Sequence, residues 1–198
     1  MLTLYHAPRS RSSRIVWLLE EIGQPYAVEY VSIRRGDGSG EADPRNPHPR
    51  GRVPALVHDG ALVIESSAIC LYLSDVFPQA GLGPQVGEAG RADYLSWLAY
   101  YQGGVEPSMV AKATDWKSPV GMTGWDDFDV VEARIAERLE AGPWMLGERF
   151  STLDVLIGSL LQWAARLFPE RPAYDSYKAR IAERPALRRA MAKDDPPP

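Results

Sequence analysis

Cysteine is almost absent from this 198-residue chain, which contains only Cys70. A single thiol cannot form an internal disulfide, so a disulfide-stapled fold is excluded. No pair of cysteine or histidine residues has the spacing of a zinc site, and the sequence contains neither a glycine-rich phosphate loop nor a GxSxG motif. Cys70 lies between two apolar residues of a predicted helix, so we expect a buried structural residue.

Long apolar runs are also missing. No stretch approaches the ~20 apolar residues of a membrane span, and residues 1–5 predict a strand rather than a signal peptide. The net charge of −4 argues against a general nucleic-acid binder. With 45% hydrophobic residues and length for one large or two small domains, we expect a soluble cytoplasmic protein with no nucleic-acid or membrane partner.

The first part of the chain alternates strand and helix patterns. Asp59-Gly60 between two apolar runs indicates a hairpin, because this pair adopts the positive φ angles that a two-residue turn requires. The predicted elements are a strand at 2–5, a helix at about 14–22 ended by Gly23, a strand at 26–33, a mostly irregular stretch at 34–50, hairpin strands at 56–58 and 62–64, and a helix at 66–76. This order predicts an α/β thioredoxin-like domain with one parallel strand pair.

After residue 77 the pattern changes. Residues 78–87 have the proline and glycine content of a linker, and apolar residues then recur at helical spacing near 94–105, 130–139 and 153–164. Ser151 and Asp154 form a capping-box variant before the last of these segments. We therefore expect a thioredoxin-like domain over 1–77, a linker over 78–87 and an all-helical domain over 88–198, with residues 194–198 as a frayed tail.

The most informative motif is Gly51-Arg52-Val53-Pro54, followed at the far end of the hairpin by Glu65-Ser66. Ser66 is an N-cap candidate for the next helix, whose N-terminus would attract a carboxylate. Taken alone, each piece has a plain interpretation as a loop or a cap. Together, at this spacing and in this order, they favour a socket for a small peptide with a free carboxylate.

This arrangement resembles the cytosolic glutathione S-transferase family, in its serine-type, bacterial-like form, over about residues 1–190. The resemblance implies that glutathione is the co-substrate and that no metal is needed. It also implies a cis Val53–Pro54 bond, with Arg52, Val53 and Pro54 at the glutathione site and Glu65 and Ser66 holding its γ-glutamyl end. His48 and Arg52 depart from the family's usual Asn and Lys, which leaves Arg34, Arg35, His48 and Arg52 as open candidates for the glycine end.

The loop after the first strand is the usual site of chemistry in thioredoxin-like proteins. It has no cysteine, so thiol–disulfide exchange by the protein's own thiol is excluded there. A hydroxyl that donates to the sulfur of glutathione would favour its thiolate. Matching Arg14 to the Arg that opens the family's first helix makes Ser10 the thiol-activating candidate, with Ser12 as runner-up and Tyr5 as a further alternative. Ser13 is then expected to cap the helix.

The electrophile is expected to be apolar and small. Aromatic residues of the second half, Tyr101 and Trp116 in particular, are candidates to line its pocket, although most aromatics at helical spacing belong to a core or a dimer interface. The sequence therefore predicts a homodimeric glutathione transferase. The alternatives are a non-catalytic glutathione-binding or interaction module, and a glutathione-dependent isomerase or peroxidase.

Overall fold

The computed structural model describes residues 1–117 and 121–196. The chain divides into two compact units. The first joins residues 1–80 to the segment that begins at Arg184, and the second spans Gly81–Glu183. The units therefore divide the chain differently from the expected domains, because the segment from Arg184 onward groups with the first unit and not with the helical part.

The first unit is built on a four-stranded sheet of order β2-β1-β3-β4. Strand β1 (Leu2–His6) pairs in parallel with β2 (Ala27–Tyr30) and antiparallel with β3 (Ala55–His58), which forms a hairpin with β4 (Ala61–Ile64). Asp59 and Gly60 both have positive φ, 49° and 85°, as a two-residue hairpin turn requires. The expected α/β thioredoxin-like architecture is confirmed, with β2 shorter than its apolar pattern suggested.

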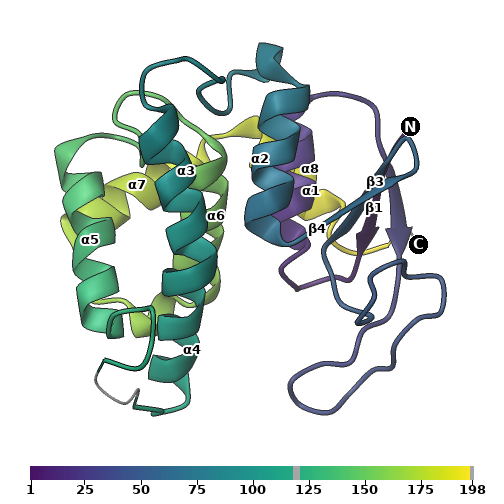
Figure 1. The fold of residues 1–198 in the computed structure, drawn as a ribbon, viewed down its shortest axis with the longest axis horizontal. Coiled ribbons are helices and arrows are strands. Elements are labelled where there is room, and N and C mark those ends of the chain that lie inside the picture. Colours follow the sequence, from purple (N-terminus) through teal and green to yellow (C-terminus); the bar gives the residue numbers. More distant parts are fainter. Residues whose placement is uncertain (118–120, 197–198) are drawn as a thin grey trace. The chain divides into compact units, whose positions relative to one another are not determined.

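Helices α1 (Ser13–Ile22), α2 (Ser66–Val76) and α8 (Pro185–Ala192) lie beside one another in this unit (Figure 1). Helix α1 ends as expected at Gly23, whose φ is 71° and whose N–H bonds the Leu19 carbonyl at 3.0 Å. A short 3-10 turn, Pro78–Ala80, follows α2. Cys70 is fully buried in α2, which confirms its structural placement.

Helix α8 is held against α1 by charged pairs. Arg184 forms a two-bond pair with Glu21 at 2.6 and 2.7 Å. Arg189 and Lys193 both bond the buried carboxylate of Glu20. These contacts give the late part of the chain a fixed place in the first unit, close to the sheet and α1.

The second unit contains no strand among its described residues and is helical, as expected. Its elements are α3 (Arg91–Tyr100), a π-helical turn (Tyr101–Val105), α4 (Glu106–Ala113), α5 (Phe128–Ala141), α6 (Thr152–Trp163), a 3-10 turn (Ala165–Leu167) and α7 (Pro172–Ala182). Ser151 and Asp154 form the predicted capping box at the start of α6. No helix within the described residues is long and apolar enough to span a membrane.

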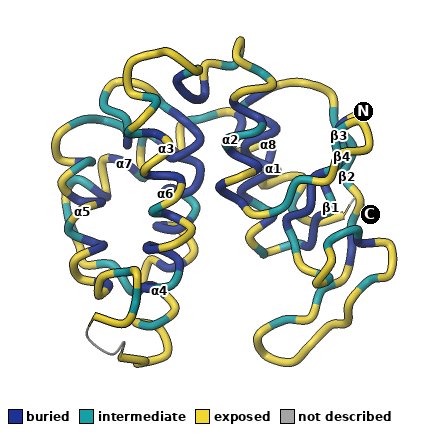
Figure 2. Tube along the Cα trace, viewed as in Figure 1, coloured by how far each residue is buried: buried dark blue, intermediate teal, exposed yellow. Residues whose placement is uncertain are grey.

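Burial follows the inner faces of the helices and the sheet, whereas most of residues 34–45 is exposed (Figure 2). Two predicted caps are wrong by one position. Helix α1 is capped at Ser12 rather than Ser13, and α2 at Glu65 rather than Ser66, and neither cap residue makes a side-chain capping bond. In both cases a neighbouring residue with a suitable side chain lies inside the first helical turn instead.

Candidate functional site

Three segments of the first unit leave the sheet at one edge. Tyr5, near the end of β1, pairs with Ala55 at the start of β3, and Ala55 pairs with Ile64 at the end of β4. The loop after β1, the proline before β3 and the start of α2 must therefore lie at that edge. This register brings together the motifs that are separate in the sequence, and it defines the candidate site.

Ser10 is the accessible hydroxyl of the loop after β1. It is partly exposed, donates to the Ala7 carbonyl at 2.7 Å and lies with its Oγ 2.8 Å from Ser12 Oγ. The Ser12 N–H bonds back to Ser10 Oγ at 3.2 Å. The side chain is thus positioned by its own loop while remaining open to a ligand.

Ser12 has the opposite character, because it is fully buried. Its Oγ lies 2.8 Å from His6 Nδ1 and accepts the Ala7 N–H at 3.2 Å. A ligand cannot reach this hydroxyl without moving the loop. Of the two predicted serines, only Ser10 is placed where a substrate sulfur could meet it.

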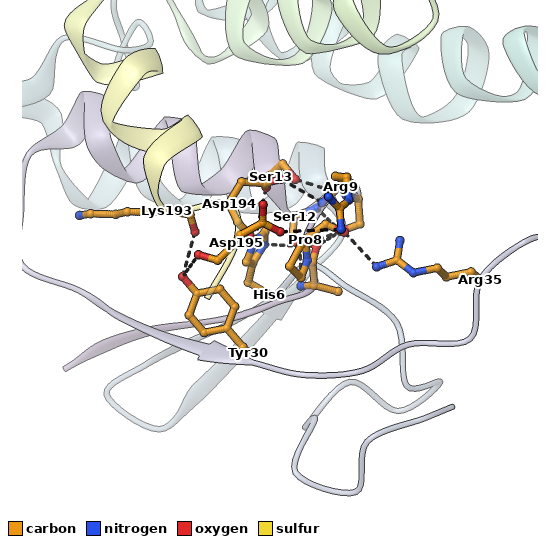
Figure 3. A network of polar contacts seen from close by, with 12 residues as sticks. His6, Pro8, Arg9, Ser12, Ser13, Tyr30, Arg35, Lys193, Asp194 and Asp195 are labelled. Carbon is orange, nitrogen blue, oxygen red and sulfur yellow. Dashed lines mark hydrogen bonds and ion pairs between the residues drawn. The ribbon is translucent and has the colours of Figure 1, made fainter. Parts of the chain in front are cut away.

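His6 and Asp194 are residues of the site that sequence reasoning missed. His6 is fully buried, and its Nε2 lies 2.8 Å from the Asp194 carbonyl and 3.5 Å from Asp194 Oδ1 (Figure 3). Tyr30 donates from its hydroxyl to the carbonyls of Lys193 and Asp195 at 2.9 and 3.2 Å. The expected frayed tail is therefore wrong for residues 194 and 195, while residues 197–198 lie outside the described part of the chain.

The same segment also holds the backbone of the loop. Arg9 is a non-glycine residue with a φ of 54°, a conformation that costs of the order of 1 kcal/mol or more. The Arg9 N–H donates to Asp194 Oδ2 at 3.0 Å. The guanidinium of Arg35 donates to the carbonyl of the preceding residue, Pro8, also at 3.0 Å (Figure 3). The loop thus keeps its strained shape through contacts with two distant segments.

The second of the three segments is the stretch before β3. The Val53–Pro54 bond is cis, as the resemblance implies. Asn46, which sequence reasoning also missed, is buried and donates to the Arg52 carbonyl at 3.0 Å. His48 accepts the Arg50 N–H on Nδ1 at 3.0 Å, and burial lowers its pKa. Arg52 itself is exposed, so its guanidinium is accessible to an anion.

The third segment is the start of α2. Glu65 is exposed and has a φ of 70°, while Ser66 is buried and opens the helix. The next hydroxyl, Ser67 Oγ, is a buried oxygen without a hydrogen-bond partner among the described residues. A strained backbone at a helix N-terminus is an arrangement common in ligand clamps.

The predicted electrophile residues lie in the second unit and are not brought together there. Tyr101 is 1% exposed and donates from its hydroxyl to Glu106 at 2.9 Å. Trp116 is half exposed, with its ring 6.1 Å from that of Trp125. A cavity of about 260 Å³ in this unit has neither of them in its lining, which includes Asp93, Arg138, Arg149 and Phe150.

Within residues 1–117 and 121–196, no group of three or more His, Cys, Asp or Glu side chains could hold a metal ion. The polar groups of the site include hydroxyls, main-chain amides and the exposed guanidinium of Arg52, together with the imidazole of His48 and the carboxylate of Glu65. This donor set suits an anionic organic ligand rather than a cation.

Comparison with known proteins agrees with the fold. The sequence model for the glutathione S-transferase N-terminal domain matches residues 9–76. The chain is 28% identical to the disulfide-bond oxidoreductase YfcG of Escherichia coli K12, over 98% of this chain and 95% of the relative. It is 25% identical to the glutathione S-transferase GstA of Escherichia coli O157:H7, over 98% of each protein.

The solved structure of a sphingomonad glutathione S-transferase complexed with glutathione is 26% identical and has a TM-score of 0.76, covering 97% of this chain and 98% of that one. A thioredoxin-like unit followed in the chain by a helical unit is the architecture of the glutathione S-transferase fold. Residues 9–76 match the glutathione S-transferase N-terminal domain, and the chain is similar over almost its whole length to proteins of that family.

Proposed function

We propose that this protein is a glutathione transferase that binds glutathione at the sheet edge of the first unit and activates its thiol with Ser10. The observation that carries the proposal is the register of the sheet, which places the Ser10 loop, the cis proline and the start of α2 at one edge. In this proposal Val53 binds the peptide backbone, Glu65 and Ser66 hold the γ-glutamyl end, and Arg52 adds positive charge.

Ser10 has the properties that thiol activation needs. The pKa of a free thiol is ~8.5, so only a few per cent is thiolate at neutral pH. A hydrogen bond from a hydroxyl and the N-terminal end of α1 both favour the thiolate. Lowering the pKa of the thiol by about one to two units corresponds to ~1.4–2.7 kcal/mol, which one such bond and a helix dipole can supply. Burial of Ser12 favours Ser10 over the runner-up.

The chemical step is a nucleophilic attack. The thiolate sulfur forms a bond to an electrophilic carbon, and the leaving group departs with the electron pair of its own bond, or an activated double bond takes up the pair and then a proton. The half-exposed Trp116 is a candidate contact for an apolar electrophile. The complete burial of Tyr101 favours a structural role for its ring. We further propose that the protein acts as a cytoplasmic homodimer.

The test combines binding and turnover. Titration calorimetry with glutathione should show binding, and a panel of reactive aromatic electrophiles should be conjugated. Ser10→Ala should lower turnover about ten- to a hundredfold, equivalent to ~1.4–2.7 kcal/mol. The affinity for glutathione should change little, because the Ser10 hydroxyl contacts only the sulfur. Cys70→Ser is the matched control and should keep full activity. Binding without turnover of any electrophile would instead support a non-catalytic module.

A second candidate activity is reduction of small disulfides with glutathione. It is favoured by the relative named as a disulfide-bond oxidoreductase. Since Cys70 is fully buried, the attacking thiolate would have to come from glutathione. It would displace one thiolate from the disulfide to form a mixed disulfide, and a second glutathione would release the other. Oxidation of glutathione in the presence of a small disulfide, measured with a reductase-coupled assay, tests this activity.

A further inference from the structure

A continuous chain of short polar contacts runs inward from Ser10. Ser10 Oγ lies 2.8 Å from Ser12 Oγ, Ser12 Oγ lies 2.8 Å from His6 Nδ1, and His6 Nε2 lies 2.8 Å from the Asp194 carbonyl. Exposure falls along this chain, since Ser10 is partly exposed whereas Ser12 and His6 are fully buried. A substrate can therefore touch Ser10 but neither Ser12 nor His6.

The contact with a carbonyl fixes the direction of the chain. A carbonyl oxygen can only accept, so His6 Nε2 carries the proton that bonds Asp194. In the neutral imidazole Nδ1 is then an acceptor, and it receives the hydroxyl proton of Ser12. Ser12 Oγ keeps lone pairs free for the Ala7 N–H and for the proton of Ser10, whose alternative acceptor is the Ala7 carbonyl at 2.7 Å.

We infer that His6 is the acceptor of the glutathione thiol proton, reached through the hydroxyls of Ser10 and Ser12 and held in the required tautomer by Asp194. This inference rests on the proposed function. Because His6 acts through two other side chains, it is a positioning residue of the relay and makes no contact with the substrate.

The relay balances as a set of three transfers. The thiol proton passes to Ser10 Oγ, the proton of Ser10 passes to Ser12 Oγ, and the proton of Ser12 passes to His6 Nδ1. The products are a thiolate and an imidazolium, with Ser10 now donating to the sulfur. After the sulfur has attacked the electrophile, the imidazolium returns its proton by the same route to the leaving group or to water.

The surroundings of His6 suit this role. Its charged and titratable neighbours are Asp194, Asp195 and Tyr30, whose ring centroid lies 5.6 Å from that of the imidazole in an edge-on arrangement. Burial lowers the pKa of His6, so the resting imidazole is neutral and able to accept a proton, while the carboxylates of Asp194 and Asp195 oppose that effect. Asp194 Oδ1, at 3.5 Å from Nε2, would stabilise the imidazolium once it forms.

The decisive variant is His6→Asn in the full chain. An asparagine at this position can still bond Ser12, but it cannot take up a proton. The apparent pKa of bound glutathione, read from the ultraviolet absorbance of its thiolate and from the pH dependence of kcat/KM, should rise by about one unit toward ~8.5. The thiolate fraction at neutral pH would then fall about three- to eightfold, while the glutathione Kd stays within about threefold.

A matched pair of variants tests the contribution of Asp194. Asp194→Asn removes the carboxylate 3.5 Å from His6, and Asp195→Asn removes the same charge from an exposed side chain that bonds no part of the relay. The pKa of bound glutathione should rise more in Asp194→Asn than in Asp195→Asn. If His6→Asn does not fold, this comparison decides, and equal values for the two variants overturn the inference.

The failure of the relay can be told apart from failure of the proposed function. A folded His6→Asn protein with a wild-type thiol pKa, alongside an impaired Ser10→Ala, overturns the relay and leaves thiol activation by Ser10 intact. A wild-type protein that binds no glutathione overturns the proposed function itself.

Discussion

His6 links the stability of the protein to pH. Because burial lowers the pKa of His6 in the folded state, its folded-state pKa lies below the ~6.5 of an unfolded chain. As pH falls below ~6.5, the unfolded state takes up a proton that the folded state does not. The free energy of unfolding should therefore be fully retained above ~6.5 and should decline as pH falls from there toward the folded-state pKa.

Urea unfolding at several pH values from 5 to 8, for the wild type and His6→Asn, measures this contribution. The difference in the free energy of unfolding between the two proteins should be largest above ~6.5 and should narrow as the pH falls. Curves that stay parallel over the whole range would show that His6 takes up its proton equally in both states.

The capping box of α6 is the element whose stability is easiest to test. Ser151 accepts the Leu153 N–H on its Oγ at 3.2 Å, and Asp154 accepts the Ser151 N–H at 2.8 Å. Ser151→Ala should lower the free energy of unfolding by about 1–2 kcal/mol, the usual cost of losing an N-cap. Ser159→Ala, which removes a hydroxyl bonded to the Leu156 carbonyl within the same helix, is the control.

Thermal or urea unfolding of the two variants should separate them clearly. If Ser151→Ala and Ser159→Ala lower the free energy of unfolding equally, the capping box stabilises the protein no more than an ordinary hydroxyl in this helix does.

Local signals were enough to predict most elements. Asp59-Gly60 defined the hairpin, the apolar spacing defined α1 and α2, and the Ser151 box defined the start of α6. The caps at Ser12 and Glu65 were missed because adjacent residues offered equally suitable side chains, and the sequence does not show which one adopts the non-helical backbone. Periodicity predicts that a helix exists but not which helix it packs against.

The candidate site was predictable in part for the same reason. The cis bond before Pro54 and the choice of Ser10 as the thiol-activating candidate came from the family resemblance that short motifs carry; the structure has the cis bond and leaves Ser10 partly exposed. The contact of His6 with Asp194 joins residues 188 positions apart, and no local pattern marks such a pair. From the sequence alone, an aspartate in a charged, proline-rich segment is expected to be solvated. Its contact with the buried imidazole of His6 exists only in the folded chain.

At the scale of the whole molecule, we predict a homodimer. The structure leaves large apolar side chains exposed on both units, including Leu62 and Val76 on the first and Leu95 and Val110 on the second, and such side chains gather in subunit interfaces. In α3, Tyr94 and Trp97 pack inside the helical unit, so Leu95 is the large, exposed apolar side chain of that helix that a partner could cover.

Light scattering at micromolar concentration should give about twice the chain mass of 21.9 kDa. Leu95→Glu should shift the mass toward that of one chain, whereas Met122→Glu, at an exposed loop position outside any helix, should not. A wild-type mass of a single chain would contradict the prediction.

Because α8 belongs to the first unit, the two units can complete their folding only in a certain order during synthesis of the chain. Residues 81–183 form a unit from one continuous stretch, so they can fold while the chain is still leaving the ribosome. The sheet and α1 emerge earlier, but α8, which packs on α1, and the Asp194 contact to His6 emerge more than a hundred residues later. The first unit is thus completed only once α8 and Asp194 have been synthesised, and the Ser10 loop can acquire its final backbone shape only then.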